Sequence, residues 1–423
     1  MREMKDSGIE WVGQIPKDWD VVPHKRVMHK VKKICEQYSG EDIISLTMNG
    51  VIKRDLTAGG KMPTSFDGYQ YVKPNDLLLC LFDIDVTPRC VGVVKDYGVT
   101  SPAYSRFVMH DGYYNAYYDY LLRAIDDDKV FVHLSKNLRS SLTESDFGAI
   151  KTCVPSLAEQ KRIVTFLDAQ CAEIDNVLEK TRASIEEYKK LKQAVITQAV
   201  TKGIRGDRPM KDSGIEWIGE IPAEWKVNLI KNVATTGSGG TPESGNPSLY
   251  DGDINWICSY DLKERPITKS ERRLTQLGAD SIAGNVQLKG SVLVAMYGGS
   301  GTIGNSGILE CEAKTNQAIC SIKFNNGYIT DYFGFYYILS IRKYWMIFAV
   351  GTRKDPNISQ DIVRKMPCIL PPIAEQEEIV AYCNKACDQL DTLITKKQQY
   401  LTEIENYKKS LIYEYVTGKK EVI

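Results

Sequence analysis

The chain has 423 residues, which at roughly 150 residues per domain predicts about three domains and more than one hydrophobic core. Hydrophobic residues make up 43% and charged residues 26%, a balance that excludes global disorder and collagen-like repetition. Lysine plus arginine equals aspartate plus glutamate, at 54 each, so the basic excess of a free-standing nonspecific DNA-binding protein is missing. Neutrality leaves two possibilities open: no nucleic-acid partner, or basic patches balanced by acidic surfaces that face elsewhere.

The sequence predicts neither membrane insertion nor secretion. No stretch approaches the roughly 18 apolar residues that span a bilayer, and the amino terminus lacks the apolar segment of a secretory signal. The 11 cysteines are scattered, contain no C-x-x-C pair and have no histidine at metal-ligand spacing. We therefore expect a cytoplasmic protein without a metal site, whose reduced cysteines pack as small apolar residues.

The chain contains an internal duplication. Residues 4–19 read MKDSGIEWVGQIPKDW and residues 210–225 read MKDSGIEWIGEIPAEW, identical at 12 of 16 positions. A second pair, PSLAEQKRIV at 155–164 and PPIAEQEEIV at 371–380, is identical at 6 of 10 positions. The copies recur while the segments between them differ, which indicates duplication followed by specialisation of each insert.

Both inserts, residues 20–154 and residues 226–370, are predicted to be α+β. In the first insert, strands are expected near 43–46, 71–72, 77–82, 91–94 and 106–108, with a helix at 116–125. In the second, strands are expected near 254–257, 291–296 and 319–324, with a helix at 332–341.

A long helix is predicted after each AEQ element. For the first, Pro155 and a capping box of Ser156 with Glu159 form a start signal. In a common heptad register, 6 of 8 seam positions are apolar in each helix. The packing residues are expected to be Ile174, Leu178, Ile185, Tyr188 and Val195 in the first helix, and Leu390, Ile394, Leu401, Ile404 and Leu411 in the second.

The polar exceptions in the two seams coincide, which favours pairing of the helices with each other over packing of each on its own domain. Thr181 matches Lys397, and Lys192 matches Lys408, where a shared lysine would help to fix the register. A linker at 201–209, rich in Gly, Pro and charge, separates the halves. If a pseudo-twofold axis relates the halves, the helices run antiparallel. The predicted fold is α+β: two globular α/β domains in tandem, separated by two long helices that form an antiparallel coiled-coil stalk.

Two glycine-rich loops, at 237–241 and 297–304, invite a phosphate-binding interpretation. Both lack the lysine and hydroxyl residue of a P-loop, and neither has the βαβ context of a dinucleotide fold. Tight turns at strand ends are therefore favoured over a phosphate site. The sequence also lacks an amino-methyltransferase motif, a Walker A motif and a histidine-based triad, so we expect no catalytic activity.

Basic residues cluster in the predicted loops of both inserts, including the pair Arg272–Arg273. Arginine and lysine beside Asn, Ser and Tyr are suited to phosphate positioning and base-edge reading, while a solvated surface charge remains the alternative for each residue. The candidates for DNA binding are Lys53, Arg54, Lys61, Arg89, Tyr104, Lys136 and Arg139 in the first insert, and Ser238, Thr241, Tyr260, Lys263, Arg265, Tyr297, Ser300, Arg353 and Lys354 in the second. Arg353, in a loop bounded by glycine and proline, is the leading candidate for a base contact.

The repeated elements resemble those of a known family. The phrase KDSGIEWIGEIPxxW, at 211–225 and nearly unchanged at 5–19, resembles the repeat of type I restriction-modification specificity subunits. The element PPIAEQxxIV at 371–380, its partner at 155–164 and the helix after each are similar to the same family. Further family-like pieces lie at 240–242, 254–257, 289–294, 315–317 and 351–353. The first insert departs from these pieces, so residue roles transfer less securely there.

The resemblance implies a non-catalytic subunit with two target recognition domains, each of which reads one half of a bipartite double-stranded DNA site. The implied organisation is a repeat segment at 1–19, a first recognition domain at 20–154, a stalk helix at 155–202, a linker with the second repeat at 203–225, a second recognition domain at 226–370 and a second stalk helix at 371–423.

The implied partners are two methylation subunits, which hold S-adenosylmethionine and modify adenine, and restriction subunits that use ATP and Mg. No cofactor is expected in this chain. A repeat scaffold that binds proteins or glycans, without a DNA role, is the alternative from another class. A third is an enzyme, as the recognition part of a fused modification-restriction protein.

Overall fold

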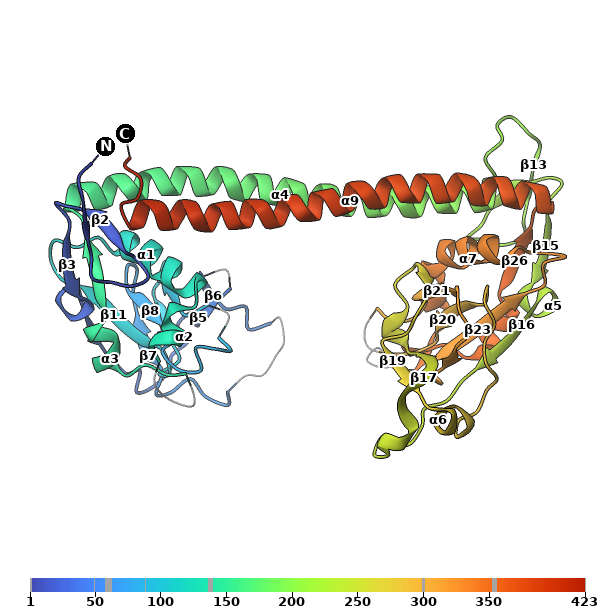
Figure 1. Cartoon of the computed structure of the whole chain (residues 1–423), viewed down its shortest axis with the longest axis horizontal. Helices are drawn as coiled ribbons and strands as arrows, with labels where there is room; N and C mark the ends of the chain where they lie inside the picture. The colour runs from blue at the N-terminus through green and yellow to red at the C-terminus, as the bar shows by residue number, and fades with distance from the viewer. Residues whose placement is uncertain are drawn as a thin grey trace. The chain divides into compact units, whose positions relative to one another are not determined.

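The structure is a computed structural model, which describes residues 2–48, 50–57, 63–87, 89–135, 140–298, 301–351 and 356–422. The chain divides into two compact units. Unit 1 comprises Met1–Arg182 and Gln399–Ile423, and unit 2 comprises Ala183–Gln398. The two long helices, α4 (Leu157–Lys202) and α9 (Ile373–Val416), each contribute one part to each unit (Figure 1). None of the described helices combines the length and apolar character that a membrane span requires.

Unit 1 is built on a four-stranded antiparallel sheet in the order β4 (Met28–Val31), β11 (Ser105–Met109), β8 (Leu77–Leu79), β9 (Val91–Val93). Four strand pairs accompany it: β1 (Met4–Asp6) with β2 (Gln14–Pro16), β3 (Asp20–Pro23) with β12 (Lys151–Val154), β5 (Ile44–Thr47) with β6 (Gly50–Lys53), and β7 (Gln70–Val72) with β10 (Gly98–Thr100). The helices are α1 (Asn115–Asp127), α2 (Val130–Leu134) and α3 (Glu144–Ala149), with a 3-10 turn at His24–Arg26.

Unit 2 has a five-stranded sheet in the order β16 (Ala234–Ser238), β23 (Ile319–Phe324), β20 (Val292–Ala295), β21 (Ser306–Leu309), β18 (Pro266–Ile267). A three-stranded sheet follows the order β19 (Arg272–Leu274), β17 (Tyr250–Ile257), β22 (Lys314–Thr315). The strand pairs are β13 (Met210–Asp212) with β14 (Glu220–Pro222), β15 (Lys226–Leu229) with β26 (Pro367–Leu370), and β24 (Val350–Gly351) with β25 (Pro356–Asn357).

The helices of unit 2 are α5 (Ile230–Val233), α6 (Gln276–Asp280), α7 (Asp331–Ser340) and α8 (Gln360–Lys365). The 3-10 turns are η2 (Pro247–Leu249), η3 (Ser259–Asp261) and η4 (Arg342–Ile347). The predicted helices at 116–125 and 332–341 correspond to α1 and α7, so the expected α+β class is confirmed. The bulkiest buried side chains of this unit include Trp225, Phe333, Tyr337 and Trp345, which share one apolar cluster with the carboxyl-terminal part of α4.

The repeated tryptophan and the glutamate of AEQ form a buried anchor in unit 1. The indole nitrogen of Trp19 donates to the carboxylate of Glu159 at 3.0 Å, and the guanidinium of Arg2 contacts the same carboxylate at 2.5 Å. Both Trp19 and Glu159 are buried. A buried carboxylate must be paired and hydrogen-bonded to be stable, so the repeat segment and the helix hold each other in place.

Unit 2 repeats this anchor with the second copy of each element. The indole of Trp225 donates to Glu375 at 3.0 Å, and Arg208 contacts the same carboxylate at 2.5 Å. The repeats therefore recur because they build one scaffold twice.

The glutamine of AEQ binds the start of a helix in each unit. The side-chain oxygen of Gln160 accepts from the backbone N–H of Tyr114, just before α1, at 2.8 Å. In unit 2, Gln376 accepts from the backbone N–H of Thr330, just before α7, also at 2.8 Å. Each contact supplies an acceptor to an amide at a helix start, where backbone donors lack intrahelical partners.

The predicted capping box at the start of α4 is half correct. The hydroxyl of Ser156 accepts from the backbone N–H of Glu159 at 3.3 Å, as expected. The carboxylate of Glu159 instead binds Trp19 and Arg2, because that distant pair supplies charge-assisted hydrogen bonds inside the core.

The long helices run antiparallel within each unit, which confirms the predicted direction. In unit 1, Asp175 pairs with Lys408 at 2.6 Å and Arg182 with Glu405 at 2.5 Å. In unit 2, Lys192 pairs with Asp391 at 2.6 Å, and the ammonium of Lys397 lies 5.7 Å from the ring centroid of Tyr188. In both units the partner's residue number falls as the number in α4 rises.

The seam between the helices follows the heptad. Leu178, Ile185, Leu390, Ile394 and Leu411 are buried, and Ile174, Tyr188, Val195, Leu401 and Ile404 are half-buried. The seam lysines Lys192 and Lys408 each reach an aspartate of the opposite helix, which explains how a cation is accommodated at this position in both helices. All 11 cysteines are free thiols, and every one except Cys311 is buried.

Candidate nucleic-acid interface

Several of the predicted DNA-binding residues lie outside the described residues, including the leading candidate for base reading. These are Lys61, Lys136, Arg139, Ser300, Arg353 and Lys354.

In unit 1, the described candidates are held by neighbours within the domain. Lys53 ends strand β6, where a loop was expected, and pairs with Asp42 at 2.7 Å. Arg89 is half-buried and donates to the backbone oxygen of Met48 at 3.2 Å. Arg54 is half-buried, and Tyr104 packs on the small apolar cluster that contains Ile44 and Leu78. Several of these residues lie around the β5–β6 hairpin, which carries Lys53, accepts the hydrogen bond of Arg89 and packs against Tyr104.

In unit 2, one turn gathers three of the segments that carry candidates. Backbone hydrogen bonds of 3.0, 3.0 and 2.7 Å join residues 315–318 to the first glycine-rich loop, to the end of β17 and to the end of β20. These segments carry Thr241, Tyr260 and Tyr297 respectively. The turn at 315–318 therefore fixes the relative positions of three segments that are distant in sequence.

An exposed amide and two hydroxyl groups meet at this turn. The hydroxyl of Thr241 donates to the side-chain oxygen of Gln317, and the hydroxyl of Ser238 donates to the backbone oxygen of Gln317 at 3.5 Å. Because the oxygen of the Gln317 amide is occupied, its amino group is the end that can donate to a ligand. Our candidate set did not include Gln317, although its family-like phrase was a signal.

The first glycine-rich loop packs closely on that turn, which explains its glycines. A Cβ on Gly239 would lie 1.6 Å from the backbone oxygen of Thr315, so no other residue fits there without a shift of the backbone. Close packing of the loop, rather than the tight turn that the sequence predicted, explains this glycine without a phosphate-binding function.

Arg272 is an exposed cation of unit 2 that two aromatic rings restrain. Its guanidinium lies 5.0 Å from the ring centroid of Tyr250 and 5.3 Å from that of Trp256. Both rings are anchored, because Tyr250 donates to the backbone oxygen of Pro242 at 2.9 Å and Trp256 donates to that of Gly240 at 3.1 Å. Cation–π contact with both rings restrains the guanidinium.

Arg272 and Arg273 lie on strand β19, where the sequence had predicted a loop. Trp256 is the cross-strand partner of Arg272, and successive side chains of a strand point to opposite faces. Only Arg272 therefore joins the aromatic pair. Arg272 is exposed and has no ion-pair partner among the residues that the structure covers. Nearby, Lys263 is exposed and pairs with Glu271 at 3.2 Å, and Arg265 is exposed.

Two tyrosines of the candidate set keep their protons. Burial raises the pKa of Tyr260, with a further contribution from the Cys258 thiol, and burial also raises the pKa of Tyr297. Their hydroxyls can therefore donate to phosphate or base oxygens at neutral pH. Within the described ranges, no three His, Cys, Asp or Glu side chains are grouped closely enough to hold a metal ion.

Comparison with known proteins agrees with the resemblance in the sequence. A family model described as the type I restriction modification DNA specificity domain matches residues 222–406. Over 97% of this chain, the type I restriction enzyme MjaX specificity subunit of Methanocaldococcus jannaschii is 22% identical, and 96% of that relative is covered. The MjaVIII specificity subunit of the same organism is 26% identical over 65% of this chain and 63% of its own length.

A solved chain described in connection with complex assembly and conformational transition of the type I R-M system has a TM-score of 0.72. It covers 96% of this chain and 99% of its own length at 15% identity, so it supports the fold. These matches do not favour a protein- or glycan-binding scaffold. Residues 222–406 therefore match the type I restriction modification DNA specificity domain, and the relatives named above, one of them similar over nearly the whole chain, are specificity subunits of type I restriction enzymes.

Proposed function

We propose that this chain selects the DNA site of a type I restriction-modification complex, and that each unit reads one half of a bipartite site. The observation that carries this proposal is the doubled anchor, Trp19 with Glu159 and Trp225 with Glu375, which presents two different inserts on one scaffold. A duplicated scaffold with different inserts supports recognition of two different half-sites.

The surroundings of Arg272 support direct contact with base edges in unit 2. An arginine restrained by Tyr250 and Trp256 keeps the two-donor geometry that recognises guanine O6 and N7. Thr241, Tyr260 and Gln317 offer hydroxyl and amide groups near the same part of the fold, and such groups commonly contact phosphate.

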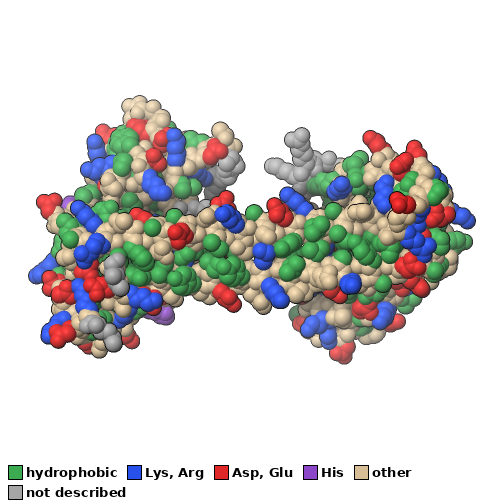
Figure 2. Space-filling model, turned by 90° about the horizontal axis from the view of Figure 1, so that it is seen from above, with side chains coloured by type: hydrophobic (Ala, Val, Ile, Leu, Met, Phe, Trp, Pro, Cys, Tyr) green, Lys and Arg blue, Asp and Glu red, His purple; other side chains and the backbone are tan. Residues whose placement is uncertain are grey.

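We further propose that two methylation subunits dock on the long helices. Both helices carry exposed apolar side chains at one heptad position, which directly precedes a seam residue. These are Val177, Tyr400 and Tyr407 in unit 1, and Leu191 and Leu393 in unit 2. Figure 2 shows hydrophobic side chains along the surface of the helices. Exposed apolar surface of this kind marks a protein interaction site.

The restriction subunits join the same complex in this proposal. S-adenosylmethionine, ATP and Mg are held by the partner subunits, and this chain contributes sequence selection without a cofactor of its own. In this proposal, the length of the paired helices determines the number of base pairs between the half-sites.

The test is co-expression of the full chain with its methylation subunit, followed by sequencing of modified adenines in host DNA. The proposal predicts modification at two short specific sequences separated by a gap of fixed length. Modification of a single continuous sequence, or modification without sequence preference, would contradict it.

A further inference from the structure

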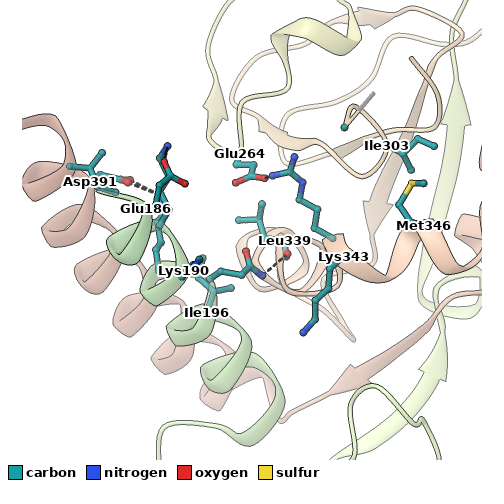
Figure 3. A pocket seen from close by; sticks show the side chains of 15 residues that line it. Glu186, Lys190, Ile196, Glu264, Ile303, Leu339, Lys343, Met346 and Asp391 are labelled. Atoms are coloured by element: carbon teal, nitrogen blue, oxygen red, sulfur yellow. Dashed lines mark hydrogen bonds and ion pairs between the residues drawn. The ribbon is translucent and has the colours of Figure 1, made fainter. Parts of the chain in front are cut away.

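Unit 2 has a groove of about 650 Å³ where α4 passes α7 and η4 (Figure 3). Its apolar lining consists of Ile196, Ile303, Leu339, Met346 and Ile394. Gln193 of α4 bridges one side, because its amide donates to the backbone oxygen of Leu339 at 3.0 Å. Met346 is 52% exposed, so the apolar lining continues to the surface.

The rim of this groove carries an excess of positive charge. Its three acidic residues are paired: Glu186 with Lys189 at 2.7 Å, Asp391 with Lys192 at 2.6 Å, and Glu264 with Arg342. The remaining cations, Lys190 and Lys343, are exposed and have no carboxylate partner in the part of the chain that the structure describes. Figure 3 shows Lys190 on α4 and Lys343 on the opposite wall.

An adjoining groove of about 520 Å³ extends the same surface. The two share Lys190, Gln193 and Lys343, and the second reaches Lys202 without an acidic residue in its lining. Along α4, the combined lining runs from Glu186 to Lys202, which is about 24 Å at the helical rise. That length matches a helix of about four turns.

The equivalent place in unit 1 lacks this excess of positive charge. The Tyr114–Gln160 and Thr330–Gln376 contacts are each offset by 216 residues (330 minus 114, and 376 minus 160), and the same offset places Asp127 at the position of Lys343. The charged residues that line the groove there, which has a volume of about 280 Å³, are Asp127, Asp128, Lys409 and Glu414. Asp127 pairs with Arg89 at 3.6 Å and Glu414 with Lys420 at 2.8 Å, which leaves one carboxylate and one cation. The two units therefore differ in what they attract at this place.

We propose that the groove of unit 2 is a docking site for an amphipathic helix of a partner protein, with an apolar face flanked by carboxylates. The apolar lining favours side chains such as leucine, and Lys190 and Lys343 favour acidic flanks. DNA fits less well, because the apolar lining reaches solvent at Met346, and a phosphate backbone would not cover apolar surface. The inference goes beyond the proposed function, since none of the exposed apolar residues assigned above to the methylation subunits lines this groove.

The test uses the full chain and a fluorescent synthetic 16-residue helical peptide with leucines on one face and glutamates beside them. Fluorescence anisotropy should show saturable binding, and a peptide with lysines in place of the glutamates should bind at least about tenfold more weakly. Lys190→Glu with Lys343→Glu should weaken binding of the acidic peptide at least about tenfold, and Met346→Ser should also weaken it. The matched control, Lys211→Glu with Lys385→Glu, reverses two exposed cations of unit 2 outside the groove and should leave the affinity unchanged. Thermal unfolding of each variant checks that the chain is folded.

No binding of the acidic peptide, or binding insensitive to the charge reversal and to Met346→Ser, would overturn the proposal. A duplex oligonucleotide that binds the wild-type chain and loses affinity in the charge-reversed variant, in place of the peptide, would assign the groove to DNA. Self-association of the chain that disappears in the same variant would assign it to a second copy.

Discussion

Replacement of Arg272 tests whether unit 2 reads a base. The guanidinium is stacked on Tyr250 and Trp256, and its donors have no ion-pair partner among the described residues. A bidentate contact with guanine contributes about 1–3 kcal/mol of discrimination, so Arg272→Ala should weaken binding to the cognate site by roughly 5- to 150-fold. Loss of an exposed cation–π contact costs about 0.5–1 kcal/mol of folding stability, too little to unfold the domain.

Arg272→Lys separates base reading from attraction to phosphate. Lysine keeps the charge but lacks the planar two-donor fork, so preference for one base pair should disappear while the salt dependence of binding stays nearly unchanged. Arg273→Lys is the matched control, because the neighbouring side chain points to the other face of the strand. The assay is anisotropy of the complex with its methylation subunit on the cognate duplex and single-base variants, at several salt concentrations. Equal loss on every duplex with a shallower salt dependence would refute base reading, and no loss would remove Arg272 from the interface.

Three further predictions concern the anchors, a buried histidine and the helices. Trp19→Phe removes a hydrogen bond to the Glu159 carboxylate and should lower the free energy of unfolding by about 1.5–3 kcal/mol in urea titrations. Trp225→Phe should cause a similar loss in unit 2. Unchanged stability would show that the anchor is dispensable. Burial lowers the pKa of His24 from 6.5 to about 4, so the folded state favours the neutral imidazole. The stability that depends on this neutral form should be present above pH 6.5 and should be lost as the pH falls toward 4, by roughly 3 kcal/mol at most. His24→Phe should flatten this part of the stability–pH curve, and an unaltered curve would assign the loss to other groups. Insertion of one heptad into both α4 and α9 preserves the apolar seam and lengthens the paired helices by about 10 Å. Sequencing of modified adenines should then show a gap between the half-sites that is longer by about three base pairs. An unchanged gap would show that the length of the helices does not determine the gap.

Local periodicity was sufficient to predict the long helices and the strands at the centre of the two main sheets, such as β8, β11, β20 and β23, because those signals depend on neighbouring residues. Most of the short paired strands were not predicted. The seam lysines Lys192 and Lys408 were predicted to share a position, and the structure adds their partners, Asp391 and Asp175. Those partners lie in the other helix, so only the antiparallel pairing of the two helices identifies them.

The errors arose where distant residues meet. Glu159 looked like half of a local capping box, but Trp19 lies 140 residues away and offers a buried donor. Arg272 looked like a loop charge, because its aromatic neighbours become visible only when β17 pairs with β19. Gln317 was overlooked for the same reason, since Thr241 reaches it across 76 residues of sequence.

In the proposed function, each insert recognises its own half-site independently of the other insert. Exchange of a single insert tests this independence most directly. Residues 20–154 would be replaced by the corresponding insert of a relative with a different site, which leaves the Trp19–Glu159 anchor intact. Modified adenines would then be sequenced in cells that express the hybrid with its methylation subunit. We predict that one half-site changes while the other half-site and the gap stay the same. A change in both half-sites would contradict the account.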